Sequence, residues 1–406
     1  MRQVFFLVSY TFKTTLLFGL FDSMIISRIK LTNWKNFRSS EVALRERVFV
    51  VGANAAGKSN FLDVFRFLRD IAKPRGGGLQ QAVSIRGGLS KIRSLAARKN
   101  PLVEIEITIS EDADSAPLYV YSIGIKQENK GKRRVMLAYE RVHSGENLVL
   151  DRPQKEDLDD DERLTLTFLE NPTTNSEFRE VAEVFGSVSY LHLVPQLLRS
   201  VKSAEIEESG EDSYGRNFLV RVSKTPERIR KSRLKRILEA LSKTVPQFDD
   251  LKEEKDKAGV PHLLMRLKHW RKDAGWQDET QFSDGTIRML GLFWSLLEGD
   301  SILLFEEPEL SLNDKIVEQL APLLWKLQSS RGRQVILSTH SYALLSDPGI
   351  NPEEALILLA DSAEGTKLKE VASMSDVVSL VSTGSMSLGE ALLPKTAPAN
   401  VADLSL

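Results

Sequence analysis

The stretch VFVVGANAAGKSNFLDVFRFL, residues 48–68, decides the fold. A short apolar run precedes the pattern GxxxxGK[ST], and apolar residues at helical spacing follow it. This order predicts a buried strand, a tight loop and a helix. In such a unit, the backbone N–H groups of the loop and the first turn of the helix converge on phosphate. The sequence therefore predicts an α/β protein with a phosphate-binding loop.

The loop fills every fixed position of the pattern, and its two polar side chains have separate chemical roles. We expect Lys58 to reach the β and γ phosphates of a nucleotide, and the Ser59 hydroxyl to ligate Mg²⁺. The residues expected to bind the nucleotide all lie in or next to the loop: Gly52, Asn54, Ala55, Ala56, Gly57, Lys58, Ser59 and Asn60.

A second apolar strand, SILLFEEPE at residues 301–309, ends in adjacent carboxylates. Desolvated carboxylates are costly when unpaired, so this position favours a cation or an attacking water as their partner. We expect Glu306 to hold the Mg²⁺ shell, the Walker B role, and Glu307 to orient or deprotonate the hydrolytic water. Ser59 and Glu306 are thus the predicted metal ligands.

Two further motifs complete an ordered series. The strand QVILST ends at His340, and a polar turn in QFSDGTIRMLG, residues 281–291, precedes the acidic strand. P-loop, turn, acidic strand and histidine in this order resemble the ABC-type ATPase head, over most of the chain from Met24 to about Ala360. The sequence is similar to bacterial ATPases related to the RecF, SMC and OLD (overcoming lysogenisation defect) groups, through LLFEEPELSL and FSDGTIRML.

The resemblance implies an ATPase that uses ATP and Mg²⁺ and forms a homodimer with ATP sandwiched between its subunits. Ser283 and Gly285 of the signature loop would contact the γ-phosphate of ATP held by a second subunit. The helix starting near Thr286 would direct its positive end there. His340 would sense the γ-phosphate. By this resemblance, the two phosphate loops would serve different ATP molecules.

Three positions depart from the family pattern. Asp284 stands where transporters have Gly, Glu306 where many Walker B strands have Asp, and Asn313 where a D-loop acid is common. We therefore expect slow hydrolysis. The Q-loop glutamine of the family would be Gln80 or Gln81, and the sequence does not choose between them.

The fold class expected from the resemblance and the hydrophobic pattern is α/β: an ABC-type ATPase head with an antiparallel β subdomain, a mostly parallel P-loop sheet and an inserted helical lobe. Strand patterns dominate from Met24 to about Leu150, and helical signals follow from about residue 176. The predicted division is an N-terminal extension at 1–23, the first part of the head at 24–150, the inserted lobe at 151–275 and the second part of the head at 276–406.

Two segments are open to more than one interpretation. Residues 1–23 are apolar, and both a packing extension and a membrane contact fit them. Lys13 interrupts the run and leaves pieces too short to span a bilayer, so no stable membrane insertion is expected. Residues 151–162 carry seven acids, which favours a solvated loop at a lobe boundary.

A basic segment follows. Residues 221–243 hold nine Lys or Arg against two Glu, and a helix is expected there, with Thr225 as N-cap and Pro226 at its first position. Such a helix would present a basic face suited to the phosphate backbone of DNA or RNA. Helix faces are also often basic for solubility alone. Nucleic-acid contact through helix 226–243 and an ordinary solvated face are therefore competing predictions.

Composition excludes several kinds of site. The chain has 406 residues and no Cys, which removes disulfides, thiolate metal sites and Cys nucleophiles and favours the cytoplasm. Its five His residues show no metal-ligand spacing. The formal net charge of −1 gives no overall attraction to nucleic acid or membrane, so such a partner must meet a local patch.

Three functions compete. The first is a dimerising ATPase that controls a DNA transaction or a partner effector acting in trans, in genome maintenance or phage defence. The second, the nucleotide-binding subunit of a membrane transporter, is disfavoured because 225 residues separate Lys58 from Ser283, roughly twice what the family resemblance allows. The third, an ATP-driven nuclease, is disfavoured because the roughly 65 residues after His340 hold no carboxylate cluster at metal spacing. The first function is therefore the prediction.

Overall fold

The computed structural model describes residues 24–97, 100–128, 133–200, 212–269, 275–299, 302–361 and 363–397. The predicted N-terminal extension, residues 1–23, lies outside this part of the chain. Among the helices of the described residues, none is both long and apolar enough to cross a membrane.

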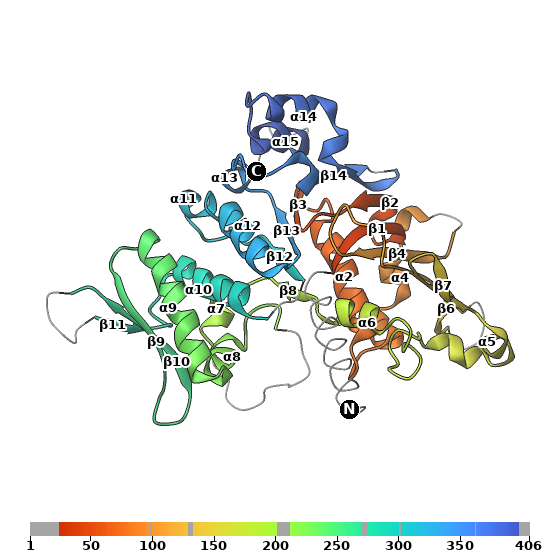
Figure 1. Cartoon of the computed structure of the whole chain (residues 1–406), viewed down its shortest axis with the longest axis horizontal. Helices are drawn as coiled ribbons and strands as arrows, with labels where there is room; N and C mark the ends of the chain where they lie inside the picture. Colours follow the sequence, from red (N-terminus) through yellow and green to blue (C-terminus); the bar gives the residue numbers. More distant parts are fainter. Residues whose placement is uncertain are drawn as a thin grey trace, which may run out of the picture.

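Most of the described strands form one 12-stranded sheet (Figure 1). Its antiparallel part comprises, in spatial order, β7 (Asn147–Arg152), β6 (Val135–Ser144), β5 (Tyr119–Gln127), β4 (Val103–Ser110), β1 (Ile25–Trp34), β2 (Phe37–Ala43) and β15 (Gly365–Glu370). β15 is also antiparallel to β14 (Ala355–Asp361), from which the parallel part continues through β3 (Arg47–Gly52), β13 (Val335–Thr339), β12 (Leu303–Glu306) and β8 (Ser189–Leu191). The predicted pairing of an antiparallel subdomain with a mostly parallel P-loop sheet is confirmed.

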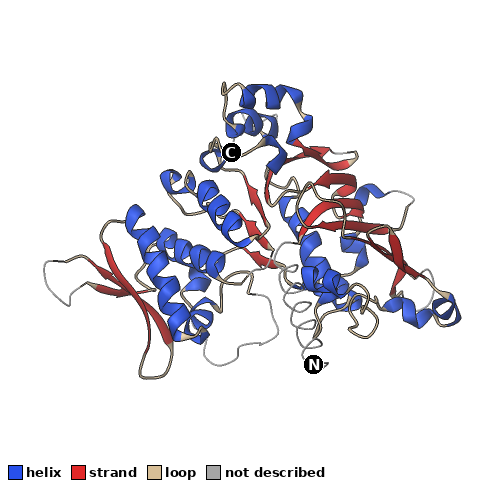
Figure 2. Ribbon diagram, in the orientation of Figure 1, coloured by secondary structure: helices blue, strands red, loops and turns tan. Residues whose placement is uncertain are grey.

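The parallel strands separate two hydrophobic cores, because successive side chains of a strand point to opposite faces. Val48 and Val50 of β3 face the core that contains α2 (Lys58–Ala72), whereas Phe49 and Val51 face the core that contains α10 (Asp284–Leu297). Figure 2 shows these helices on either side of the parallel strands. The helix after the P-loop and the helix after the Ser-Asp-Gly turn therefore pack on opposite faces of one sheet.

The remaining elements cover these cores or extend from them. A second sheet contains β9 (Phe248–Lys255), β10 (Pro261–Leu267) and β11 (Trp276–Asp278). The other helices are α3 (Leu79–Ser84), α4 (Leu89–Ile92), α5 (Lys155–Asp159), α6 (Arg179–Gly186), α7 (Pro195–Leu198), α8 (Phe218–Lys224), α9 (Glu227–Thr244), α11 (Asp314–Val317), α12 (Leu320–Arg331), α13 (Tyr342–Leu345), α14 (Ser375–Ser382) and α15 (Leu388–Thr396). β8 lies within the segment predicted as an inserted lobe, yet it pairs with β12 of the main sheet.

The basic segment forms α9, which begins at Glu227, one residue later than expected, with Pro226 in the capping position. Its buried side chains are Leu234, Ile237 and Leu241, at the spacing that places them on one helix face. That face packs against β9 and α10 (Figure 1).

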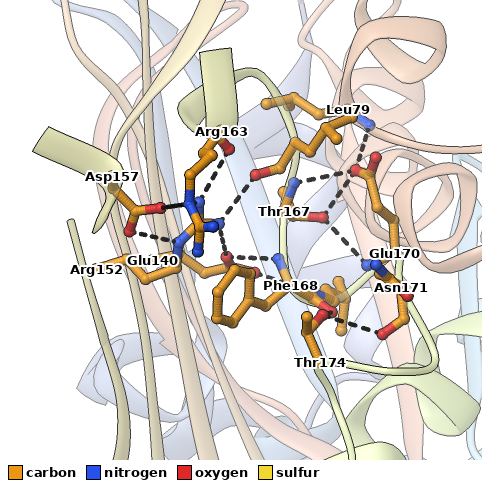
Figure 3. A network of polar contacts seen from close by, with 12 residues as sticks. Leu79, Glu140, Arg152, Asp157, Arg163, Thr167, Phe168, Glu170, Asn171 and Thr174 are labelled. Atoms are coloured by element: carbon orange, nitrogen blue, oxygen red, sulfur yellow. Dashed lines mark hydrogen bonds and ion pairs between the residues drawn. The ribbon is translucent and has the colours of Figure 1, made fainter. Parts of the chain in front are cut away.

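The acidic run contains a buried ion network instead of only a solvated loop (Figure 3). The side chains of Arg152, Glu140 and Asp157 have no exposed surface. Arg152 donates to Glu140 at 3.0 Å, to Asp157 at 2.9 Å and to the carbonyl oxygens of Leu166 and Arg163. The prediction of a solvated loop is therefore wrong at Arg152 and Asp157, because the sequence did not reveal that Glu140 lies opposite Arg152 on the neighbouring strand β6.

The same network fixes the chain that follows the acidic run. Glu140 accepts hydrogen bonds from the backbone N–H groups of Phe168 and Leu169, and Glu170 accepts one from Leu79 at the start of α3 (Figure 3). Residues 155–171 are thereby tied both to the antiparallel sheet and to the helix next to α2.

Candidate nucleotide site

The P-loop takes the predicted strand–loop–helix form. β3 ends at Gly52 and α2 begins at Lys58. Two loop residues have positive φ, Ala55 at 62° and Gly57 at 104°. A Cβ atom at Gly57 would lie 1.9 Å from Asn36 Nδ2, so both the backbone angle and the close approach require glycine there.

Two residues outside the motif support the loop from behind. Asn36 Nδ2 donates to the carbonyl oxygen of Ala56 at 2.9 Å, and the Thr366 hydroxyl donates to the same oxygen at 2.8 Å. Asn60 donates to Asn36 Oδ1 at 2.8 Å. Asn36 and Thr366 were not predicted from the sequence, because they come from the β1–β2 turn and from β15, and no local pattern links them to the loop. Asn54 and Ala55 are exposed at the rim of the loop, where a phosphate could meet their backbone.

Lys58 is held at the base of the loop. Its side chain is buried, and its Nζ donates to the carbonyl oxygens of Gly52 at 2.9 Å and Ala53 at 3.3 Å. Glu307 Oε1 lies 3.9 Å from Nζ. The ammonium group therefore stands between the P-loop and the end of β12, where it can meet a phosphate.

The two predicted metal ligands meet. The Ser59 hydroxyl at the start of α2 hydrogen-bonds Glu306 Oε1 at the end of β12. The hydroxyl of Tyr190, on the neighbouring strand β8, hydrogen-bonds the other oxygen, Glu306 Oε2. Burial, followed by the contact with Glu306, raises the pKa of Tyr190, so the phenol stays protonated and donates. Hydroxyl and carboxylate oxygens suit Mg²⁺, so the residues present fit this cation.

The two predicted catalytic residues also meet. His340, just after β13, has its Nδ1 3.1 Å from Glu307 Oε1, just after β12. Glu307 has a φ of 45°, a left-handed conformation that costs free energy for a residue with a side chain. Its N–H donates to the carbonyl oxygen of Ser338 of β13 at 3.1 Å, which holds this conformation in place. The His340 side chain is 46% exposed, so it is accessible to a ligand.

Glu309 is a third acid at this edge, and its position at the end of SILLFEEPE did not by itself predict a role. Its carboxyl group is buried; Oε1 accepts from the Thr339 hydroxyl at 2.6 Å and from the N–H of His340 at 3.3 Å. Its Oε2 is buried without a hydrogen-bond partner among the described residues, and burial raises the pKa of Glu309. Glu309 therefore anchors the loop that carries His340.

The signature loop is arranged differently. Ser283 is exposed and caps α10, its Oγ accepting the N–H of Thr286 at 3.2 Å. A Cβ atom at Gly285 would lie 2.8 Å from the carbonyl oxygen of Ser311, so this turn packs closely on the loop after Walker B. Asp284, one of the three departures from the family pattern, pairs with Arg199 at 2.6 Å. Within the described residues, no hydrogen bond or ion pair joins Ser283 or Gly285 to the P-loop.

The two Q-loop candidates lie on α3. Gln80 Nε2 donates to the carbonyl oxygens of Val135 at 2.9 Å and Thr165 at 2.7 Å. Its amide therefore links β6 to the turn that follows the acidic run. Gln81 is exposed on the same helix. The Q-loop role of either residue stays a prediction.

A cavity of about 1070 Å³ opens beside the P-loop, past Ser59 and Asn60. Its wall includes Lys35 and Arg93 as cations and Leu95 as a fully exposed apolar side chain. The cavity is large enough for the base and ribose of a nucleotide whose phosphates lie on the P-loop.

Residues 47–346 match the protein family described as "AAA domain, putative AbiEii toxin, Type IV TA system". The chain belongs to this family. Among solved structures, it is similar to an SMC head bound to the C-winged helix domain of ScpA, with a TM-score of 0.51, 14% identity, and coverage of 85% of this chain and 97% of that one. No curated protein matches the sequence.

A second similar structure is an SMC head domain with an extended coiled coil bound to the C-terminal domain of ScpA, derived from Pyrococcus furiosus. Its TM-score is 0.49 and its sequence identity 13%, and the match covers 88% of this chain and 100% of that one. At such identities, the likeness concerns the fold. Family and fold together confirm the predicted resemblance to SMC- and RecF-like ABC-type ATPases.

Proposed function

We propose that this member of the AAA family binds ATP with Mg²⁺ and slowly hydrolyses it to ADP and phosphate. The observation that carries the proposal is the meeting of four groups at one edge of the parallel sheet. Lys58, Ser59 with Glu306, Glu307 and His340 come from three neighbouring strand ends. A buried ammonium group bonded to backbone oxygens, beside a carboxylate held in a left-handed conformation, favours a functional site over a purely structural one.

Each residue has a distinct role in the proposed reaction. Lys58 and the P-loop N–H groups bind the β and γ phosphates, and the cavity past Asn60 receives the nucleoside. Ser59 and Glu306 hold the cation, which neutralises charge on the phosphates when bound. Glu307 accepts a proton from the attacking water and orients it. His340 donates to the γ-phosphate and is positioned by Glu307 on one side and by the Glu309-anchored loop on the other.

The proposal includes a homodimer with ATP between the subunits. Ser283 and Gly285 lie at the N-terminus of α10, where backbone N–H groups and the helix dipole favour an anion. Ser283 is exposed and its contacts lie within its own turn, so its surface is available to a nucleotide held by another subunit.

The biological output proposed for the dimer is control of a DNA transaction or of an effector protein in trans, in the cytoplasm. Exposed basic residues lie along α9: Arg228, Lys231, Lys235, Arg236 and Lys243. They support contact with a nucleic-acid backbone. The toxin–antitoxin system named in the family description favours phage defence, and genome maintenance is the alternative.

Replacing Glu307 with Gln tests the proposed hydrolysis. The change removes the base and keeps its size, so ATP should still bind and drive dimerisation, while turnover falls by about 10²–10⁴-fold. Light scattering with ATP and Mg²⁺ should show a persistent dimer. Glu41→Gln, at an exposed acid of β2, is the matched control and should hydrolyse like the wild type. Wild-type turnover by Glu307→Gln would assign the base to another residue.

A further inference from the structure

Tyr190 lies next to Glu306, one of the two predicted Mg²⁺ ligands, and hydrogen-bonds its carboxylate. β8 runs parallel to β12, and Tyr190 lies opposite Leu304 in the register. Glu306 follows Leu304 by two residues, so both side chains point to the same face of the sheet as Tyr190, the face that packs on α2. This geometry brings the phenol hydroxyl to Glu306 Oε2, while Ser59 approaches Oε1.

Arg66 holds the phenol ring from the other side. Its guanidinium group lies 4.1 Å from the centre of the Tyr190 ring, a cation–π contact. Ser59 and Arg66 are seven residues apart, so they lie on one face of α2, two turns from each other. One helix face therefore contacts both the carboxylate and the residue that holds it.

We propose that Tyr190 is a positioning residue for Mg²⁺ binding: it fixes the Glu306 carboxylate by one oxygen and so presents the other to the metal site at Ser59. The proposal rests on the proposed function. A carboxylate without this bond would rotate about its side-chain torsions, and ordering it again on metal binding would cost entropy. Residues that hold a metal ligand from behind commonly change metal affinity by about 10–100-fold when removed.

Neither the P-loop pattern nor the acidic strand identifies this residue. Tyr190 is 116 residues from Glu306 and belongs to a three-residue strand at the edge of the sheet. Only the position of β8 beside β12 brings the two side chains together.

The test compares Tyr190→Phe with Tyr121→Phe. Both substitutions remove one hydroxyl group that contacts a glutamate, but the partner of Tyr121 is Glu140 in the buried ion network. The probe is the fluorescence of N-methylanthraniloyl-ATP, titrated with Mg²⁺, and compared with binding in EDTA. Tyr190→Phe should raise the Mg²⁺ midpoint by about 10-fold and leave binding in EDTA unchanged. Tyr121→Phe should leave both unchanged.

A second comparison separates positioning from simple loss of packing. In a Glu306→Gln protein, adding Tyr190→Phe should cause no further change in the Mg²⁺ midpoint, because the group through which Tyr190 acts is already altered. An additive loss would overturn the proposal. So would a Tyr190→Phe protein that responds to Mg²⁺ like the wild type. If the wild type binds the nucleotide equally with and without Mg²⁺, the metal part of the proposed function fails as well.

Discussion

Two clusters of buried charge in this molecule differ in how completely their groups are paired. In the Arg152 network, the guanidinium group bonds two carboxylates and two backbone carbonyl oxygens. The side chains of Arg152, Glu140 and Asp157 have no exposed surface. The second cluster lies at the edge of the parallel sheet beside the P-loop. Among the described residues, Lys58 hydrogen-bonds only backbone oxygens, and Glu307 lies 3.9 Å from its ammonium group. One carboxylate oxygen of Glu309 is buried without a hydrogen-bond partner among these residues.

The difference is what we expect if the first cluster stabilises the fold and the second binds a ligand, as proposed. Burial opposes ionisation of both acids in the Arg152 network. It raises the pKa of Glu140, whereas bonds from Arg152, the N–H of Gln154 and Arg163 lower the pKa of Asp157 to about 2. Burial also raises the pKa of Glu309, which follows β12. Unlike Glu140, which accepts from Arg152, Glu309 has no hydrogen bond from a cationic side chain among the described residues. Complete pairing leaves nothing for a ligand to gain, whereas incomplete pairing leaves charge that a ligand can neutralise.

The largest expected effect on stability is at Arg152. Arg152→Met leaves Glu140 buried without a cation and Asp157 paired only with Arg163, and breaking such a buried pair typically costs about 3–5 kcal/mol of unfolding free energy. Urea unfolding at fixed temperature measures this. Nucleotide binding by the folded fraction should be retained.

Arg141→Met is the matched control on the same sheet. Its ion pair with Asp151 is about half exposed on both sides, so the decrease in unfolding free energy should not exceed about 1 kcal/mol. If Arg152→Met and Arg141→Met unfold at the same urea concentration, the buried network contributes no more to the unfolding free energy than a surface ion pair does, and the proposed difference between the two clusters is wrong.

A smaller effect, confined to binding, is expected on α9. Arg230 pairs with Glu253 and Arg233 packs over the ring of Trp294, so these two belong to the fold. Lys231 pairs with Glu227 on the same helix. Changing the other four exposed residues, Arg228, Lys235, Arg236 and Lys243, to Glu should weaken nucleic-acid binding and reduce its salt slope by about 1 for each phosphate that is no longer neutralised. Fluorescence anisotropy with a labelled duplex at several salt concentrations measures both.

The control for α9 is Arg230→Gln, which should lower stability and leave the salt slope near that of the wild type. If the variant with four exposed basic residues changed to Glu binds the duplex like the wild type, α9 does not contact nucleic acid and its basic face is an ordinary solvated surface. ATP hydrolysis without nucleic acid should be the same in the reversed variant and in the wild type.

The sequence predicted those parts of the site that local geometry encodes. A strand, a glycine turn and a helix specify the P-loop, and the ends of neighbouring parallel strands bring Glu306, Glu307 and His340 to one edge. Asn36, Thr366 and Tyr190 could not be predicted, because their contacts depend on strand order. Thr366 meets Ala56 across 310 residues of sequence.

The acidic run illustrates the same limit for the fold. Its composition is typical of a solvated loop, and several of its acids are exposed. Asp157 is buried only because β6 and β7 bring Glu140 and Arg152 together beneath it. The charge composition therefore predicted the exposed acids of this segment but not the buried ion pair of Asp157 with Arg152.

Mixing two inactive variants tests whether ATP is bound between two subunits. Lys58→Ala removes phosphate binding in its own subunit, and Ser283→Arg blocks the surface offered to the other. In a mixed dimer, one ATP site combines Lys58 of the Ser283→Arg subunit with Ser283 of the Lys58→Ala subunit, so both residues are intact. The other site contains both substitutions. With random exchange, half the dimers are mixed, so independent sites should restore roughly a quarter of wild-type turnover.

The measurement is steady-state ATP hydrolysis by each folded variant alone and by the mixture, with ATP-dependent dimerisation recorded by light scattering and subunit exchange demonstrated separately. We expect each variant alone to be inactive, and the mixture to dimerise and hydrolyse ATP. A fully exchanged mixture that neither hydrolyses ATP nor dimerises would contradict the role of Ser283 across the subunit boundary.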